Sequence, residues 1–152
     1  MTHYYWDTSA IAKHYYPEIG TPKVDAILAE PDAIHFISRL GTVELRSVFA
    51  KRVRMGSLST SDFHLVCRQV FTDVANGVYQ VIPILTHSFR EAERLLTTHA
   101  TVSSLRTLDA IQLAVARDVQ QQGKLDYFIC ADATLCNVAT VEGLAVINPE
   151  NP

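Results

Sequence analysis

The sequence predicts an α/β fold with a doubly wound, mostly parallel sheet covered by helices on both faces. Short apolar runs rich in β-branched or aromatic residues alternate with longer segments of helical periodicity along the 152 residues. Strands separated by helices are typical of parallel βα units. The chain has no repeat, low-complexity tract or linker, so we expect a single domain over residues 1–152.

Five short runs are the strand candidates, and each is bounded by turn or helix signals. They are His3–Trp6, Ile34–Ser38, Gln80–Leu85, Tyr127–Ala131 and Ala145–Asn148.

Helices are expected between these strands. Pro17 stops the first helix, Ser59 is suited to cap the fourth, and Gly123 ends the sixth. The expected helices are Thr8–Tyr16, Pro22–Ala29, Val43–Met55, Ser61–Val74, Ser88–His99, Thr107–Gln121 and Ala133–Val141.

Charge and cysteine content narrow the function classes. The chain has 13 Lys and Arg residues and 16 Asp and Glu residues, a net charge of −3. This excludes a chain-wide polycation that wraps nucleic acid, but it does not exclude a local basic patch. The three cysteines form no CxxC pair, which favours a reducing compartment. With no signal peptide and no apolar stretch of ~18 residues, we expect a cytoplasmic protein without a membrane segment.

Acidic residues follow the predicted strands. Asp7 comes directly after the first strand and Asp132 after the fourth, while Glu44 and Asp109 lie in the first turns of two predicted helices. Ligands of doubly wound sheets bind outside the carboxyl ends of the strands. We therefore expect the four acids to meet at one edge of the sheet.

Each acid also has a simpler explanation. Asp7 and Asp132 could cap the helices that follow them, and Asp109 could interact favourably with the dipole of its own helix. Glu44 could pair with Lys51 or Arg46. Taken together, however, four carboxylates at one edge repel each other unless a cation neutralises them. Carboxylate oxygens select Mg²⁺ or Mn²⁺, and such a metal can activate water for phosphodiester cleavage.

Four segments in order resemble the PIN-domain ribonucleases, most of all the VapC toxins of toxin–antitoxin pairs. The segments are Asp7-Thr8-Ser9-Ala10-Ile11-Ala12-Lys13, Thr42-Val43-Glu44-Leu45, Leu105-Arg106-Thr107-Leu108-Asp109-Ala110 and Ala131-Asp132-Ala133-Thr134-Leu135. The resemblance covers nearly the whole chain, through Gly143-Leu144-Ala145-Val146. Two positions depart from the family pattern: Cys130 stands where relatives often carry Thr, and Gln112 where many carry His.

The resemblance implies a three-layer α/β/α PIN-like fold with a five-stranded, mostly parallel sheet. It implies an endoribonuclease that depends on Mg²⁺ or Mn²⁺, with RNA as substrate, a cognate antitoxin and a homodimeric state. Asp7 and Asp109 would be the principal metal ligands, and Glu44 and Asp132 would complete the catalytic set. Thr8, Ser9 and Arg106 would support the site.

A basic stretch is the candidate RNA surface. Between Arg39 and Val70, six basic residues stand against two acids. RNA phosphates could be bound by Arg46, Lys51 and Arg52, and also by Lys13 near the Asp7 edge. A solvent-exposed helix face would explain the same charges. An apolar set in the same region could form a dimer or antitoxin surface, or could pack inside the chain. Its members are Phe49, Phe63, Val66, Val70 and Phe71.

Two other functions are compatible with parts of the pattern. The chain could be a catalytically silent PIN-like module that binds RNA or protein, although all four acids are present. A phosphorylation receiver would want paired acids after the first strand, where Asp7 stands alone.

Overall fold

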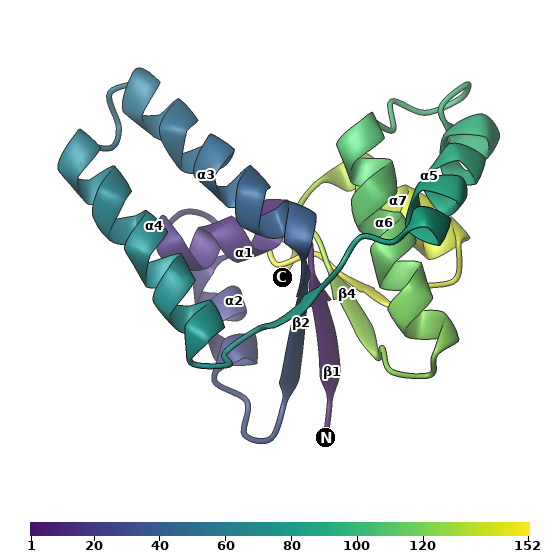
Figure 1. The fold of residues 1–152 in the computed structure, drawn as a ribbon, viewed down its shortest axis with the longest axis horizontal. Helices are drawn as coiled ribbons and strands as arrows, with labels where there is room; N and C mark the ends of the chain where they lie inside the picture. The colour runs from purple at the N-terminus through teal and green to yellow at the C-terminus, as the bar shows by residue number, and fades with distance from the viewer.

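The computed structural model describes all 152 residues, and its centre is a five-stranded sheet in the order β3-β2-β1-β4-β5. All neighbouring strands are parallel, which confirms the predicted doubly wound sheet. β1 is the central strand, so the loop after it lies in the middle of the carboxyl edge (Figure 1). The strands are β1 (His3–Trp6), β2 (Ile34–Ser38), β3 (Gln80–Ile82), β4 (Tyr127–Ile129) and β5 (Val146–Ile147).

Seven helices connect the strands, and the expected ones are all present. Their bounds are α1 (Thr8–Tyr15), α2 (Thr21–Leu28), α3 (Arg39–Arg54), α4 (Thr60–Ala75), α5 (Thr86–His99), α6 (Thr107–Gln121) and α7 (Ala133–Val141). None of these helices is long and apolar enough to cross a bilayer.

Two boundaries differ from the sequence prediction by three or more residues, and several others differ by one or two. α3 begins at Arg39, four residues before the predicted Val43, because the Ser38 hydroxyl accepts a hydrogen bond from Gly41 N and caps the helix directly at the end of β2. β3 ends at Ile82 rather than Leu85. The next residue is Pro83, which has no N–H to donate to a neighbouring strand.

The helices form two layers, one on each face of the sheet (Figure 1). Successive side chains of β1 alternate between the faces. Tyr4 and Trp6 pack with residues of α1 to α4, such as Phe49, whereas Tyr5 packs with residues of α5 to α7, such as Leu113. The sheet is therefore buried on both faces, as a parallel sheet requires.

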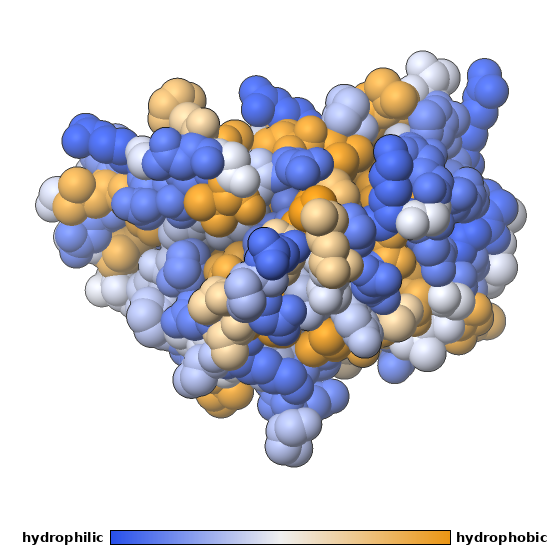
Figure 2. All heavy atoms as spheres, turned by 90° about the horizontal axis from the view of Figure 1, so that it is seen from below, coloured by the Kyte–Doolittle hydropathy of each residue, from blue (hydrophilic) through white to orange (hydrophobic).

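The apolar residues of α3 and α4 are divided between core and surface. Phe49 and Val70 are buried, and Phe63 and Val66 pack partly against the same core. Phe71 alone of this group is mainly exposed. Internal packing thus accounts for most of the predicted apolar set. In Figure 2, apolar atoms are scattered among polar ones over the face seen from below.

The last residues of the chain pack onto the segment between α1 and α2. Gly20 has a φ of +94°, and a Cβ there would meet the backbone of Pro149 at 3.1 Å. A side chain at this position would therefore be strained by its φ and crowded by the tail. Lys13 Nζ lies 2.6 Å from Glu150 Oε1, which adds an ion pair to this contact.

Candidate active site

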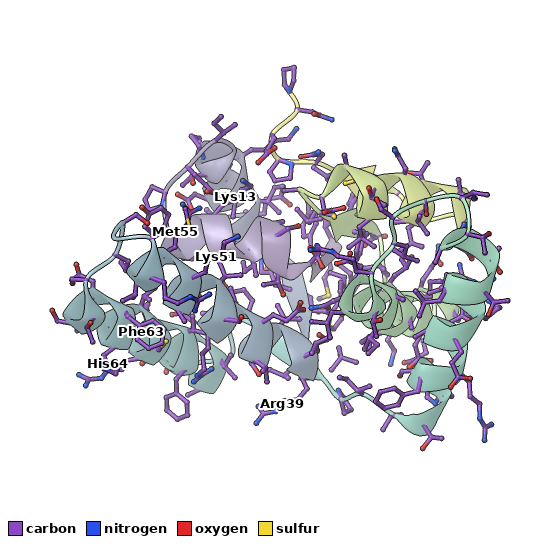
Figure 3. The ribbon with its side chains drawn as sticks, turned by 90° about the horizontal axis from the view of Figure 1, so that it is seen from above. Lys13, Arg39, Lys51, Met55, Phe63 and His64 are labelled. Atoms are coloured by element: carbon purple, nitrogen blue, oxygen red, sulfur yellow. The ribbon has the colours of Figure 1, made fainter.

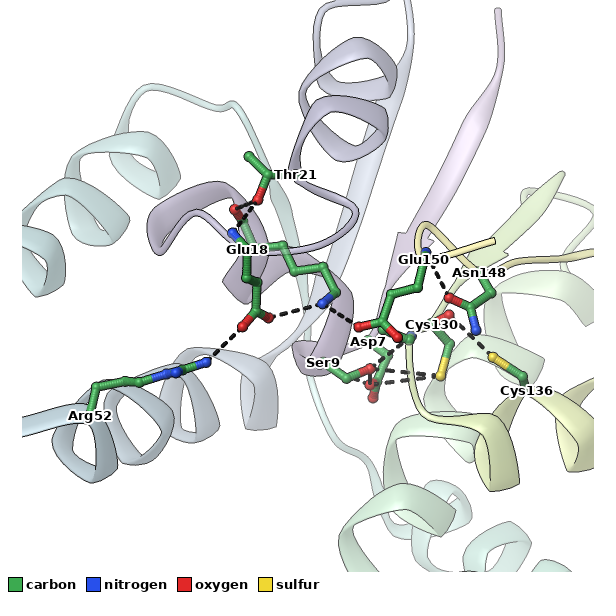
Figure 4. Close-up of polar contacts among 11 residues, drawn as sticks. Asp7, Ser9, Glu18, Thr21, Arg52, Cys130, Cys136, Asn148 and Glu150 are labelled. Carbon is green, nitrogen blue, oxygen red and sulfur yellow. Dashed lines mark hydrogen bonds and ion pairs between the residues drawn. The ribbon is translucent and has the colours of Figure 1, made fainter. Parts of the chain in front are cut away.

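Asp7 lies at the carboxyl end of the central strand and begins α1. Its N–H donates to the carbonyl of Ile129 on β4, and its side chain caps α1 by accepting from Ser9 N at 3.0 Å. The Ser9 hydroxyl donates to the same carboxylate and accepts from Ala131 N at 3.0 Å. Figure 4 shows this junction, where Ser9 connects the Asp7 carboxylate to the loop after β4.

The Cys130 thiol lies beside this junction. Its Sγ is 4.0 Å from Asp7 Oδ2 and 3.8 Å from Ser9 Oγ. A hydrogen bond with Cys136 and burial raise the pKa of the Cys130 thiol, so the thiol stays protonated and adds no negative charge beside Asp7.

Arg106 joins two of the other acids. Its Nε donates to Asp109 Oδ2 at 3.0 Å, and its Nη2 lies 3.7 Å from Asp132 Oδ2. Asp132 also caps α7 by accepting from Leu135 N at 2.8 Å. The Arg106 side chain is 74% exposed, so the guanidinium covers the acids from the solvent side without being fixed by packing.

Glu44 reaches the same edge from the second turn of α3. Its Oε1 accepts a hydrogen bond from Gln112 Nε2 at 2.6 Å and another from Thr8 Oγ1 at 3.1 Å. The expected alternatives, Lys51 and Arg46, do not pair with it, and Arg46 instead donates to the carbonyl of Thr42. Glu44 is thus held by α1 and α6, facing the sheet edge.

The pKa values show that these acids share one electrostatic environment. The pKa of Asp7 is raised to about 6, mainly by burial and also by the charges of Glu44 and Asp109, against the lowering effect of the Ser9 hydrogen bonds. Burial and the charge of Asp109 also raise the pKa of Glu44. For Arg106, hydrogen bonding to Asp109 raises the pKa, with contributions from Asp132 and Asp7. All four acids, which we call the acidic edge, therefore interact with each other or with Arg106.

The ligand type and the charge of the acidic edge suit a divalent cation, but its side chains are not arranged to coordinate one. Its donors are all carboxylate oxygens, and one cationic side chain already lies among them. No group of three or more His, Cys, Asp or Glu side chains is arranged closely enough to hold a metal as it stands. Because Arg106 pairs with Asp109 and Asp132, a bound cation would compete with it for these carboxylates.

The acids can cap or begin their helices and also belong to the site, so the two explanations given by the sequence are compatible. Asp7 and Asp132 do cap their helices, and Asp109 is indeed a first-turn acid of α6. Because a cap uses one side-chain oxygen, the helix starts themselves hold these carboxylates at the carboxyl edge.

The RNA-binding candidates have different surroundings. Lys13 is only 3% exposed, and its Nζ pairs with Glu18 at 2.9 Å and Glu150 at 2.6 Å, so its charge is committed within the protein. Arg52 pairs with Glu18 and lies over the Tyr16 ring. Arg46 and Lys51 are exposed on α3. Figure 3 shows Lys51 farther along α3 from Arg39, with Lys13 on the neighbouring α1.

Gln112 is the residue of this region that sequence reasoning left without a role. It is fully buried and bonded to Glu44, although it appeared only as a departure from the family pattern. A usable signal was its spacing: Gln112 lies three residues after Asp109, on the same face of a predicted helix, where residues i and i+3 are neighbours.

Comparisons with known proteins give structural matches only. No model of a known protein family matches the chain, and no curated protein matches it either. Among solved structures, FitAcB from Neisseria gonorrhoeae has a TM-score of 0.66 at 17% identity, covering 98% of this chain and 99% of its own. VapC20 from Mycobacterium tuberculosis, described as a Sarcin-Ricin loop cleaving toxin, has a TM-score of 0.69 at 14% identity, covering 96% and 99%.

A toxin–antitoxin complex from Klebsiella pneumoniae is similar over almost its full length as well. Its TM-score is 0.60 at 19% identity, and the match covers 95% of this chain and 96% of that one. At identities this low, similarity over nearly the whole of both chains shows a likeness of fold. The chain therefore has a VapC-like PIN-domain fold.

Proposed function

We propose that this chain is an endoribonuclease that requires Mg²⁺ or Mn²⁺ and acts as the toxin of a toxin–antitoxin pair. One observation carries the proposal: Asp7, Glu44, Asp109 and Asp132, from four distant segments, form one acidic edge in which a buried carboxylate has a pKa of about 6. Concentrated negative charge at a functional edge is the pattern expected of a cation site. The fold, like that of a described RNA-cleaving toxin, adds support.

In this proposal the acids hold the cation and the neighbouring side chains hold the acids. A bound divalent metal supplies a water of lowered pKa and stabilises charge on the phosphate. Ser9 keeps the Asp7 carboxylate against the β4 loop, and Thr8 donates to Glu44. Because the Arg106 side chain is 74% exposed, it can leave its ion pairs with Asp109 and Asp132 and bind a phosphate oxygen of the RNA instead.

The proposed partners follow from the same comparison and from the surface. Similar structures include complexes of toxins with antitoxins, so we propose a small protein antitoxin for this chain. Arg46 and Lys51 are the proposed RNA contacts, because both are exposed and neither forms an ion pair. The exposed Phe71 on α4 belongs to the proposed homodimer or antitoxin surface. We also propose that the protein acts on this RNA in the cytoplasm.

The test is cleavage of total cellular RNA with Mn²⁺ or Mg²⁺, followed by mapping of the new 5′ ends. Wild type should cleave, EDTA should stop it, and Asp7→Asn should reduce cleavage to background. Asn remains a good N-cap, and removing a charge that burial disfavours leaves the fold intact. Asp62→Asn, an exposed acid on α4, is the matched control and should keep full activity. Cleavage by Asp7→Asn at the wild-type rate would contradict the mechanism.

A second candidate is a silent PIN-like module that binds RNA or protein. The absence of a ready three-residue metal group in the structure favours it. A Mn²⁺ titration separates the two: binding that Asp109→Asn abolishes supports the nuclease, whereas RNA binding without any Mn²⁺ binding supports the module. For the toxin role, expression of this chain should arrest growth, and co-expression of the proposed antitoxin should restore growth.

A further inference from the structure

The Gln112 side chain lies at the centre of a hydrogen-bond network that ends at Glu44. Gln112 is fully buried in α6, and its amide makes four hydrogen bonds to four different segments. Nε2 donates to Glu44 Oε1 at 2.6 Å and to Thr8 Oγ1 at 3.2 Å. Oε1 accepts from Tyr5 Oη at 2.8 Å and from Ser38 Oγ at 2.9 Å. The amide's two hydrogens and two lone pairs are all used.

The two hydroxyl groups determine which way the amide points. Ser38 Oγ already accepts from Gly41 N as the cap of α3, so its own hydrogen is free to go to Gln112. Tyr5 is also fully buried, and burial raises the pKa of its hydroxyl, so the group remains a donor. Two donors require the oxygen of the amide to face them. The NH₂ group must then face Thr8 and Glu44.

This orientation has a consequence for Glu44. Gln112 and Thr8 both donate to Oε1, whereas Oε2 receives no hydrogen bond from the protein. The carboxylate is thus held by one oxygen while the other remains available at the acidic edge. A buried apolar side chain at position 112 could fill the space but could not hold Glu44 in this way.

We infer that Gln112 is a positioning residue, which fixes the Glu44 carboxylate in the orientation that a divalent cation needs. The inference rests on the proposed function, since it concerns the same acidic edge. Gln112 touches neither substrate nor metal in this role, and it acts through Glu44. Groups that orient metal ligands typically change metal affinity by ~10–100-fold when they are removed.

Direct Mn²⁺ binding to the whole chain, measured by calorimetry and by the EPR signal of free Mn²⁺, tests this role without relying on activity. Gln112→Met keeps the volume of the side chain and removes all four hydrogen bonds. It should weaken Mn²⁺ binding by ~10–100-fold. Gln112→Asn keeps an amide but is too short to join both hydroxyls to Glu44, so it should weaken binding in the same direction. It also guards against a folding failure of Gln112→Met.

Val115→Ala is the matched structural control. Val115 is fully buried on the same helix but bonds to none of the acids, so its truncation should lower the melting temperature without changing the Mn²⁺ affinity. If both folded Gln112 variants bind Mn²⁺ as tightly as wild type, or if Val115→Ala weakens binding equally, the positioning role is wrong. Failure of the proposed function has a different signature: wild type itself would then bind no Mn²⁺, and the positioning role would fall with it.

Discussion

At the scale of single residues, two side chains of the acidic edge also accept hydrogen bonds from backbone N–H groups. Asp7 and Asp132 satisfy free N–H groups at helix starts and at the same time contribute charge to one edge. Their positions could be predicted from the sequence because a strand end followed by a helix start places a residue locally. The spacing of Gln112 from Asp109 indicates its helix face, but its bonds to Tyr5 of β1 and Ser38 of β2 could not be predicted, because only the folded chain brings these segments together.

Lys13 and Lys51 differ in burial, so we expect substitution of Lys13 to change stability and substitution of Lys51 to change RNA binding. Lys13→Met removes a 3%-exposed ammonium with two carboxylate partners and should destabilise the fold by about 1–3 kcal/mol, since hydrogen bonds to charged groups contribute that much. Lys51→Ala should leave the free energy of unfolding unchanged but weaken RNA binding. Urea denaturation and RNA binding at two salt concentrations check both. A stable Lys13→Met protein with weakened RNA binding would reverse these assignments.

At the scale of elements, ion pairs join the three helices on one face of the sheet. Glu91 of α5 pairs with Arg94 at 2.8 Å and with Arg117 of α6 at 2.7 Å. Glu142, at the end of α7, lies 2.7 Å from Arg94 and 3.1 Å from Arg117. The sequence predicted the bounds of α6 and α7 correctly from local caps and stops, but these pairings between helices depend on tertiary packing and were not foreseeable.

This ion-pair group predicts a pH dependence of stability. The hydrogen bond from Arg94, and further pairing with Arg117, lower the pKa of Glu91 from 4.5 to about 2 in the folded state. Because the folded pKa lies below the unfolded one, the stabilisation is fully present above about pH 4.5 and is lost as the pH falls towards about 2. Glu91→Gln should therefore be less stable than wild type at pH 7, and the difference should shrink with acidification.

Urea denaturation at pH 7, 4 and 3 measures that difference. Glu93→Gln, which removes an exposed charge without an ion pair on the same helix, is the control and should show little difference from wild type at pH 7. A Glu91→Gln deficit that stayed constant down to pH 3 would show that packing, rather than charge, causes it.

At the scale of the whole molecule, the sheet order brings together acids that lie far apart in sequence. β1 pairs with β2 on one side and β4 on the other, so Asp7 lies between the segments that carry Glu44 and Asp132. The alternation of strands and helices predicted this layered architecture. It could not predict the strand order, because periodicity within each segment contains no information about which strands become neighbours.

The charge of this assembled edge predicts that metal stabilises the entire fold. A ligand that binds only the native state adds about 2.7 kcal/mol to unfolding free energy at 100 times its Kd. We expect Mn²⁺ to raise the melting temperature of wild type in a concentration-dependent way. Asp109→Asn should lose most of this increase, and Mn²⁺ should stabilise Asp62→Asn as it does wild type. An equal increase in Asp109→Asn would mean that the stabilising ion binds elsewhere.

The central place of β1 also bears on how the protein is made. The ribosome synthesises β1 first, yet its neighbour β4 follows only at Tyr127–Ile129, and the register joins Tyr4 to Tyr127. Until β4 has been synthesised, one side of β1 has no partner, and long-range pairings of this kind form slowly. A nascent or truncated chain that stops before β4 also lacks Asp132. The acidic edge is thus completed only after Asp132 has been synthesised, so chains that stop earlier cannot carry the full set of four carboxylates.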